Sequence, residues 1–376
     1  MLLVVNSGSS SIKLALFDGA QQVLDAQASE IGGASRLRIG GADRTLPLAD
    51  HRSALAALLT AMEAAGHPVG RIHAAAHRVV HGGAGLTRAC RVTPAVLDAI
   101  RACLPLAPLH NPANLAGIEA LAVLLPDLPQ YASFDTAFHA TMPELATRYA
   151  LPPEAEAMGL RRYGFHGLSY ASIAERLPGL LGGMPARVLA YHLGNGASAC
   201  AMLDGRSVAT SMGYSPVDGL TMGTRTGSID PTVVLRLAEV HGIEGAERML
   251  NRASGLLGLG GHSDMRALLA DPSPRAGFAV THFIRSAVTH GGALMAAMGG
   301  LDAVVFTGGI GENATPVRAG ILDGLAWAGV AYDKAANDAG AERLQPQGAR
   351  LSVLVLLAEE EAQIAAEARA LMEAGA

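Results

Sequence analysis

Two segments of the chain, about half of its 376 residues apart, have the same plan. Each runs from an apolar strand through a turn of small residues into a second strand and ends at Asp-Gly, over 4–19 and again over 193–205. When the two are aligned on Asp-Gly, Gly8 falls on Gly194. One interpretation is that any two hairpins with glycine turns look alike without a common origin. The other is a duplicated domain with two hairpins facing each other across a cleft, where backbone N–H groups could meet a phosphate chain.

Apolar spacing along the rest of the chain predicts an α/β protein with covered sheets. Helical spacing occurs at 52–66, 93–103, 113–124, 169–180, 231–241, 275–298 and 358–374. Buried strands are predicted at 2–5, 12–17, 73–80, 130–134, 187–193, 199–203, 302–307 and 351–357.

Composition excludes several classes of protein. The net charge is −5 without long basic runs, so the sequence predicts no binding to nucleic acid. Three cysteines form no CxxC pair, which argues against disulfides or structural zinc and favours a reducing cytoplasm. We expect no signal peptide and no membrane span, because apolar stretches are short and interrupted.

Three turns of small residues follow predicted strands, at 6–13, 192–196 and 307–313. The first contains Lys13, one of only two lysines in the chain. Glycine at such places lets the backbone approach a phosphate closely, although any single turn of this kind is usually a plain turn. No GxxxxGK[ST] is present, so a Walker-type loop is excluded. The GxGxxA at 194–199 is followed by strand residues, where a dinucleotide site needs a helix.

Four charged or titratable residues lie in apolar or glycine-rich surroundings: Arg78, Asp135, His166 and Arg225. A buried charge is costly unless it is paired. One interpretation is an ordinary salt bridge between Arg78 and Asp135. The other is a cationic site for phosphate and carboxylate, which the planar guanidinium fits. His77, His81 and His110 could ligate a metal, but packing or hydrogen bonding is the default interpretation for them.

Nearly the whole chain resembles the acetate kinase family, which includes propionate kinases and belongs to the actin-like and sugar-kinase ATPase superfamily. The resemblance rests on VVNSGSSSIK (4–13), HRVVHGG (77–83), PLAPLHNPANLAGI (105–118), SFDTAFHATMP (133–143), RRYGFHG (161–167), HLGNGAS (192–198), SMGYSPVDGLTMGTRTGSIDP (211–231), SGLLG (254–258) and TGGIGEN (307–313).

The resemblance implies two duplicated actin-like (ribonuclease H-like) domains, 1–147 with the C-terminal helix 359–376, and 148–358, with a nucleotide cleft between them. It also implies reversible phosphoryl transfer from ATP to acetate, giving ADP and acetyl phosphate, with Mg²⁺ or Mn²⁺. The implied catalytic residues are Arg78, Asp135, His166 and Arg225. Those implied for the acid are Arg78, Val80, Leu109, Phe165 and Pro216. Those implied for ATP are Lys13, His192, Leu193, Gly194, Asn195, Gly196, Asp264, Met265, Arg266, Gly309, Ile310, Gly311, Glu312 and Asn313, and those for the metal are Asn6 and Glu360.

The chemistry agrees with these roles and qualifies one of them. Phosphoryl transfer spreads negative charge over oxygens, so fixed cations are the main catalytic device. Acetate is ionised near pH 7 and needs no strong base. We therefore interpret Asp135 as positioning Arg78 or metal-bound water, and not as a proton acceptor.

Two departures from the family pattern affect the predicted site. The family's GTSH becomes Gly167-Leu168-Ser169-Tyr170, which puts the hydrogen bonds around His166 in question. Its T-N-E-E becomes Ala358 followed by three glutamates. Alignment selects Glu360 as the metal ligand with a register uncertain by one, while acids at a helix start are also favoured without any metal.

Rival functions are a propionate or other short-chain acyl kinase, a sugar kinase and an actin-like ATPase without kinase activity. A sugar kinase needs polar groups for hydroxyls, whereas the four implied acyl-pocket positions are apolar. Retained Arg78 and Arg225 argue against a non-enzymatic scaffold. The resemblance implies a cytoplasmic homodimer, and leaves acid preference, nucleotide preference and reaction direction open.

Overall fold

A computed structural model describes residues 1–375 and divides into two compact units. Unit 1 contains residues 1–138 and the chain from Glu359 onward, and unit 2 contains His139–Ala358. Unit 1 thus ends earlier than the predicted boundary at 147. The reason is local: the His139 ring contacts the Ser207 hydroxyl and the Phe165 carbonyl, and Thr141 donates to the Ser207 carbonyl, so this segment is tied to unit 2.

Unit 1 is built on an eight-stranded sheet with the order β5-β4-β3-β2-β1-β6-β8-β7. Its elements are β1 (Leu2–Gly8), β2 (Ser11–Asp18), β3 (Gln21–Ser29), β4 (Arg36–Ile39), β5 (Ala42–Thr45), α1 (His51–Ala64), η1 (Val69–Arg71), β6 (Ala74–Val79), β7 (Cys90–Arg91), α2 (Pro94–Ala102), η2 (Leu104–Leu106), α3 (Asn111–Leu124), β8 (Gln130–Phe134) and α14 (Glu360–Glu373). The short η3 (Ala137–Thr141) crosses into unit 2.

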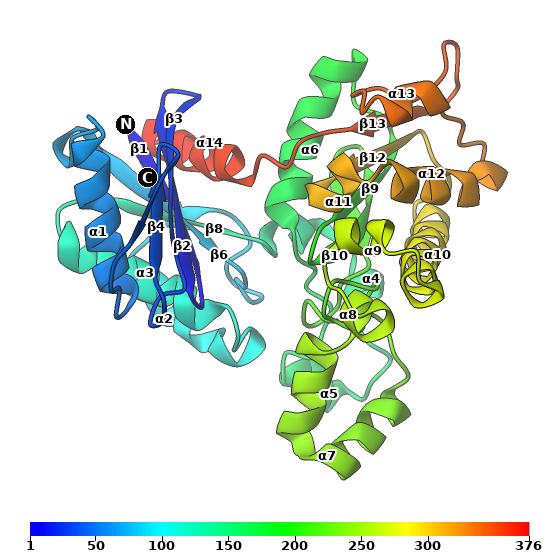
Figure 1. Cartoon of the computed structure of the whole chain (residues 1–376), viewed down its shortest axis with the longest axis horizontal. Helices are drawn as coiled ribbons and strands as arrows, with labels where there is room; N and C mark the ends of the chain where they lie inside the picture. The colour runs from blue at the N-terminus through cyan, green and yellow to red at the C-terminus, as the bar shows by residue number, and fades with distance from the viewer. Residues whose placement is uncertain (376) are drawn as a thin grey trace. The chain divides into compact units, whose positions relative to one another are not determined.

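Helices cover both faces of this sheet. Figure 1 draws α1 and α3 on one side and the C-terminal α14 on the other. On the α1 side, Leu3 and Val5 of β1 pack with Leu55 and Leu58 of α1 in one buried cluster. On the other side α14 contacts β1, β6 and β8. Because β1 is buried on both faces, its sequence is a continuous apolar run before Asn6.

Unit 2 is built on a five-stranded sheet with the order β11-β10-β9-β12-β13. Its elements are α4 (Glu144–Thr147), α5 (Pro153–Ala157), α6 (Gly167–Leu181), β9 (Arg187–Leu193), β10 (Ala197–Leu203), β11 (Arg206–Thr210), α7 (Pro231–Arg252), α8 (Gly255–Gly260), α9 (Met265–Ala270), α10 (Pro274–Ala297), β12 (Ala303–Thr307), α11 (Gly308–Asn313), α12 (Thr315–Gly324), η4 (Ala326–Ala328), α13 (Lys334–Asp338) and β13 (Ser352–Val355).

The two sheets share a five-strand core, and this confirms the predicted α/β class and the repeated hairpin. In unit 1, β3-β2-β1-β6-β8 is antiparallel through β1 and parallel beyond it. In unit 2, β11-β10-β9-β12-β13 has the same order and the same directions. The small-residue turns predicted around Gly8 and Gly194 join corresponding hairpins, β1-β2 and β9-β10.

Several elements differ from the sequence prediction. Segment 307–313 was expected to be a turn, but from Gly308 it forms α11, because Gly308 turns the chain with φ 78° and helical hydrogen bonds follow. The helix expected to end at 241 continues to Arg252 across a non-helical Gly242. Strands β3, β4, β5 and β11 were not predicted: β4 alternates but is only four residues long, and polar residues interrupt the apolar pattern of the other three. No helix within residues 1–375 is long and apolar enough to cross a membrane.

Candidate active site

A largely buried arginine in unit 1 is paired with two carboxylates. Arg78 lies on β6 and Asp135 follows the parallel neighbour β8. The Arg78 Nε and Nη2 atoms donate to the two Asp135 carboxylate oxygens at 2.9 and 2.8 Å. Nη1 lies 3.2 Å from Oε2 of Glu360, in the first turn of α14. The salt bridge left open from the sequence therefore exists, and it gathers three predicted site residues.

Charge pairing dominates this cluster. Burial alone lowers the pKa of Arg78, but the attraction of Asp135 and then of Glu360 outweighs it and raises that pKa, so the guanidinium stays charged. Burial raises the pKa of the Asp135 carboxyl, and the attraction of Arg78 opposes that rise. Two carboxyl groups therefore face one guanidinium in this cluster.

Two asparagines of α3 hold the loop that follows Arg78. Asn114 accepts from the Val80 N–H at 3.0 Å and donates to the Ser7 carbonyl of β1 at 2.7 Å. Asn111 accepts from and donates to the backbone of His81, at 3.0 and 2.9 Å. These residues belong to the HNPAN motif, but no role was predicted for them from the sequence. The available signal was two asparagines beside a proline at a helix start, and the structure shows that both are buried.

The remaining unit 1 residues of the predicted site are less buried. Asn6 and Lys13 are direct cross-strand partners in the β1-β2 hairpin, with Asn6 half-buried and Lys13 exposed. Val80 and Leu109 are half-buried. Their predicted partners in the acyl pocket, Phe165 and Pro216, belong to unit 2.

The histidines of unit 1 are hydrogen-bonding residues. His77 Nε2 lies 2.6 Å from the side-chain oxygen of Gln130, and His81 Nδ1 accepts from the Gly83 N–H at 2.9 Å. Burial lowers the pKa of each imidazole to about 4. Residues 1–375 contain no group of three or more His, Cys, Asp or Glu that could hold a metal. The hydrogen bonds of His77 and His81 agree with the default interpretation of these two residues.

Two imidazoles stack in unit 2. The His166 and His192 rings lie 4.1 Å apart with 22° between their planes. His166 precedes α6 in a left-handed conformation, φ 58°, and its Nδ1 lies 2.8 Å from the Ser198 hydroxyl. His192 is the last but one residue of β9, and its Nδ1 lies 2.9 Å from the Ser169 hydroxyl. Each ring is thus held through Nδ1 by a serine hydroxyl.

Arg225 and His166 converge on the loop between β9 and β10. A Cβ placed on Gly196 would lie 3.3 Å from His166 Nε2 and 3.5 Å from Arg225 Nη1, so only glycine leaves this space open. Arg225 Nη1 donates to the Pro216 carbonyl at 3.2 Å. Burial lowers the pKa of Arg225, although a guanidinium stays charged in proteins, and within residues 1–375 it forms no ion pair. It is a cation available to an anion.

A cavity of about 670 Å³ opens next to this loop within unit 2. Its size falls in the range of small-molecule and cofactor sites. Its lining includes eight of the residues predicted for ATP: Gly194, Asn195, Asp264, Met265, Arg266, Gly309, Ile310 and Asn313. His192, Leu193, Gly196, Gly311 and Glu312 are not among the lining residues. The structure therefore brings together two segments predicted to bind adenosine, about 264–266 and 309–313, and one end of the β9-β10 loop.

Two charged side chains brace α11 at the edge of that cavity. One carboxylate oxygen of Glu312 accepts from the N–H groups of Gly308 and Ala358 at 2.9 and 2.8 Å. Fully buried Arg318 donates to the carbonyls of Gly311 and Glu312 at the end of α11. Glu312 is therefore engaged with backbone, and Arg318 is a supporting residue that the sequence analysis missed.

The departure at 167–170 leaves a complete hydrogen-bond network around His166. The Tyr170 hydroxyl lies 2.5 Å from the Ser198 hydroxyl that contacts His166, and Ser169 contacts His192. Leu168 is buried at 2 % exposure. The question raised by the sequence is thus answered: this chain supports both histidines with hydroxyls.

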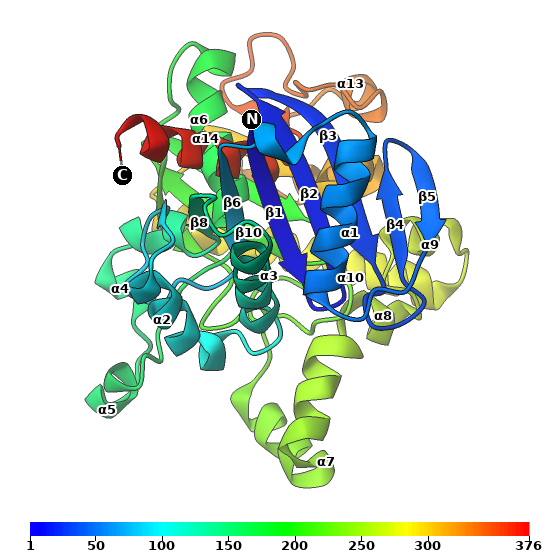
Figure 2. The ribbon, with the colours of Figure 1, turned by 90° about the vertical axis from the view of Figure 1, so that its left-hand side faces the viewer.

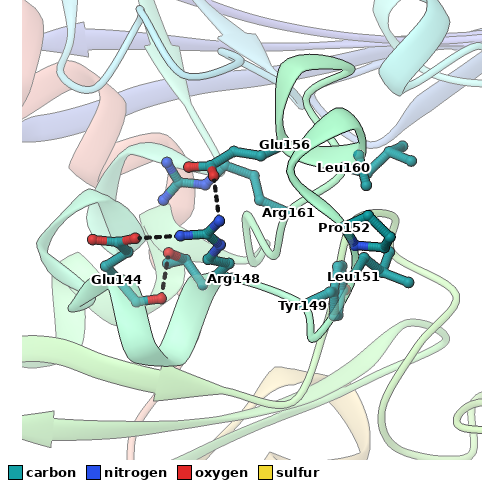
Figure 3. Close-up of a pocket in the computed structure, with 10 residues that line it drawn as sticks. Glu144, Arg148, Tyr149, Leu151, Pro152, Glu156, Leu160 and Arg161 are labelled. Atoms are coloured by element: carbon teal, nitrogen blue, oxygen red, sulfur yellow. Dashed lines mark hydrogen bonds and ion pairs between the residues drawn. The ribbon is translucent and has the colours of Figure 1, made fainter.

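A second pocket in unit 2, shown in Figure 3, does not fit a substrate. Its volume is about 40 Å³, enough for very few water molecules. The Arg148 guanidinium that faces it is already paired with Glu144 and Glu156, at 3.1 and 3.0 Å. Too little space is left there for a nucleotide.

Comparison with known proteins decides the family. The profile of the Acetokinase family matches residues 1–366. The chain belongs to this family. An acetate kinase of Rhodopseudomonas palustris is 44% identical over 395 residues, which cover 100% of this chain and 99% of that relative. The family's members are phosphotransferases with a carboxyl group as acceptor.

Solved structures of the family share this fold. The acetate kinase of Porphyromonas gingivalis is 35% identical with a TM-score of 0.92 and covers 99% of both chains. A propionate kinase of Francisella tularensis is 36% identical with a TM-score of 0.93 and covers 97% of this chain and 98% of its own.

Proposed function

We propose that this protein is an acetate kinase, which transfers the terminal phosphoryl group of ATP to acetate and gives ADP and acetyl phosphate, reversibly. One observation carries the proposal: an arginine without an ion-pair partner and the Nε2 of His166 converge on Gly196, next to the 670 Å³ cavity. Fixed hydrogen-bond donors of this kind stabilise the charge that develops on equatorial phosphoryl oxygens.

Two roles in unit 1 follow from the charge pairing. Arg78 is proposed to bind the acetate carboxylate through the N–H groups of Nη1 and Nη2 that Asp135 and Glu360 leave unused, because a guanidinium has five N–H donors and these contacts take three. Asp135 orients Arg78 through the bidentate pair already formed. No general base is required, because acetate is ionised at neutral pH.

The residues near Arg78 also fit the family's divalent cation, Mg²⁺ or Mn²⁺. Mg²⁺ usually binds through one or two carboxylates and substrate phosphates, so it needs no cluster of three protein ligands. The proposed ligands are the amide oxygen of Asn6 and the carboxylate of Glu360. Asp135 and Glu360 both form ion pairs with Arg78. Bound there, the ion would neutralise negative charge on the nucleotide phosphates.

The metal assignment predicts different effects for three neighbouring glutamates. Glu360→Gln should raise the Mg²⁺ concentration for half-maximal activity more than Glu359→Gln or Glu361→Gln, because Glu360 is the glutamate of the three whose carboxylate forms the ion pair with Arg78. Mg²⁺ titrations of kcat for the three variants measure this. Equal small effects would mean that the cluster serves only as an acidic helix start.

The apolar positions predict preference for a short acid. None of the four proposed acyl-pocket positions is a small Gly or Ala that would leave spare volume: they are Val80, Leu109, Phe165 and Pro216. We therefore expect a higher kcat/KM for acetate than for propionate, and a low kcat/KM for butyrate. One methylene changes such a preference by about 10- to 200-fold. Val80→Ala should shift the ratio towards propionate, while Val96→Ala, an apolar deletion in the α2 packing, should not. An unchanged ratio in Val80→Ala would remove it from the acyl pocket.

A steady-state acid panel with ATP and Mg²⁺, read as acyl hydroxamate, separates the candidate functions. Acetate as best substrate supports the proposal. Propionate as best substrate would make the chain a propionate kinase, like the structural neighbour from Francisella tularensis. ADP release with sugars in place of acids would favour a sugar kinase, and the absence of acyl hydroxamate with every acid tested would favour a non-enzymatic ATPase.

We further propose a cytoplasmic homodimer. The three cysteines are unpaired, which suits a reducing compartment.

Helix α7 exposes Val233, Leu235, Val240 and Ile243 at 45, 64, 56 and 80 %, and both views draw it protruding from its unit (Figures 1 and 2). Exposed apolar side chains grouped on one helix favour an interface there. Light scattering should give twice the chain mass, and Leu235→Glu/Ile243→Glu should give monomers; an unchanged dimer would place the interface elsewhere.

A further inference from the structure

Three polar groups form a continuous chain behind His166. The Tyr170 hydroxyl lies 2.5 Å from Ser198 Oγ, and Ser198 Oγ lies 2.8 Å from His166 Nδ1. Tyr170 and Ser198 are both 0 % exposed. Tyr170 lies near the start of α6, the helix that begins directly after His166. Ser198 is the second residue of β10, the strand that begins directly after Gly196. Two elements that carry the proposed site therefore meet in this chain of hydrogen bonds.

We propose that Tyr170 and Ser198 are positioning residues that keep the proton of neutral His166 on Nε2, aimed at the transferred phosphoryl group. This inference rests on the proposed function. It assigns a role to the tyrosine that stands where the family pattern has histidine, and it explains how this chain supports His166 without that residue.

The direction of the hydrogen bonds follows from the acidity of the hydroxyls. A phenol, with a pKa near 10, is a much stronger donor than an aliphatic hydroxyl, so Tyr170 donates to Ser198 Oγ. The single proton of Ser198 is then directed to its other neighbour, His166 Nδ1. Because Nδ1 accepts, the neutral imidazole carries its proton on Nε2. Of the atoms near a Cβ placed on Gly196, His166 Nε2 is the nearest, and Arg225 Nη1 lies close to the same point.

The stacked neighbour limits how the His166 ring can turn. His192 lies 4.1 Å away and is held by Ser169 in the same way, so the two rings restrain each other. Rotation of His166 about its ring axis would break the contact with Ser198 and carry Nε2 away from Gly196. Loss of the Tyr170 hydroxyl should therefore make the position of the His166 Nε2–H donor less fixed, without removing any group that contacts the substrates.

Kinetics of Tyr170→Phe, Ser198→Ala and the double variant test this relay. We expect Tyr170→Phe to lower kcat about 3- to 10-fold, the range of one hydrogen bond, with the KM for ATP and acetate within twofold. The double variant should be no slower than Ser198→Ala, because Tyr170 acts through Ser198. Tyr191→Phe is the matched control: its hydroxyl is equally buried but donates to the Ala287 carbonyl, and kcat should stay within twofold.

Nitrogen-15 NMR of histidine-labelled protein gives a readout independent of activity. Wild-type His166, assigned by its loss in His166→Asn, should show an Nε2–H tautomer, and Ser198→Ala should shift that resonance towards a mixture. A wild-type Nδ1–H tautomer, additive effects in the double variant, or equal losses in Tyr170→Phe and Tyr191→Phe would overturn the inference. Full activity of His166→Asn would instead overturn the proposed site itself, so the two failures can be told apart.

Discussion

Replacing Arg225 with alanine is expected to lower kcat for acetyl phosphate formation by about 10²-fold or more while the fold survives. Within residues 1–375 the Arg225 side chain hydrogen-bonds to a backbone carbonyl and a methionine sulfur and forms no ion pair, so its removal leaves no buried carboxylate unpaired. An arginine acting on transition-state charge contributes about 10³- to 10⁵-fold in related phosphoryl transfers. The KM for acetate should change little, because the interaction is proposed to strengthen only in the transition state.

The control is an arginine in the same unit with similar partners. Arg275 donates to the carbonyls of Leu259 and Gly258 on the surface, and Arg275→Ala should keep kcat within twofold. Circular dichroism and thermal melting of both variants check folding. Near-normal kcat in folded Arg225→Ala would remove Arg225 from the catalytic machinery.

Arg78→Ala should act in a different way, on acetate binding and on stability. Its proposed partner is the ground-state carboxylate, so the KM for acetate should rise more than kcat falls. Removal also leaves Asp135, 2 % exposed, without its bidentate partner, and breaking a buried pair costs about 3–5 kcal/mol of unfolding free energy. An unchanged KM for acetate would show that Arg78 is only a structural cation.

The stability loss should depend on pH. Burial raises the pKa of Asp135 even beside Arg78, and without Arg78 that pKa rises further. A carboxyl whose folded-state pKa is raised contributes stability that is present below its unfolded pKa and is lost as pH rises through the folded pKa. In urea titrations, Arg78→Ala should therefore differ more from wild type at pH 8 than at pH 5. Arg78→Ala/Asp135→Asn removes the titrating group and should show no such difference.

The sequence predicted those parts of the fold that follow from continuous apolar runs. Strands such as β1 and β12 are buried on both faces, and their runs are visible without a structure. The repeated hairpin was visible because both copies keep the small-residue turn and the Asp-Gly pair. The edge strand β5 is exposed along its whole length and polar, so no hydrophobic pattern marks it.

The site was predictable as a set of residues but not as a set of contacts. Motifs pointed to Arg78, His166 and Arg225, but no motif could show that, within residues 1–375, Arg78 pairs with two carboxylates and Arg225 with none. Supporting residues such as Arg318 and Tyr170 act through packing and hydrogen bonds between segments far apart in sequence, and Tyr170 departs from the usual family pattern. Only the fold reveals those partners.

Phosphorus-31 NMR of the purified protein with ATP, Mg²⁺ and acetate tests the central claim most directly. The account predicts that acetyl phosphate and ADP appear together, that neither forms without acetate, and that acetyl phosphate with ADP regenerates ATP. Release of inorganic phosphate at the same rate with and without acetate, with no acetyl phosphate resonance, would contradict it.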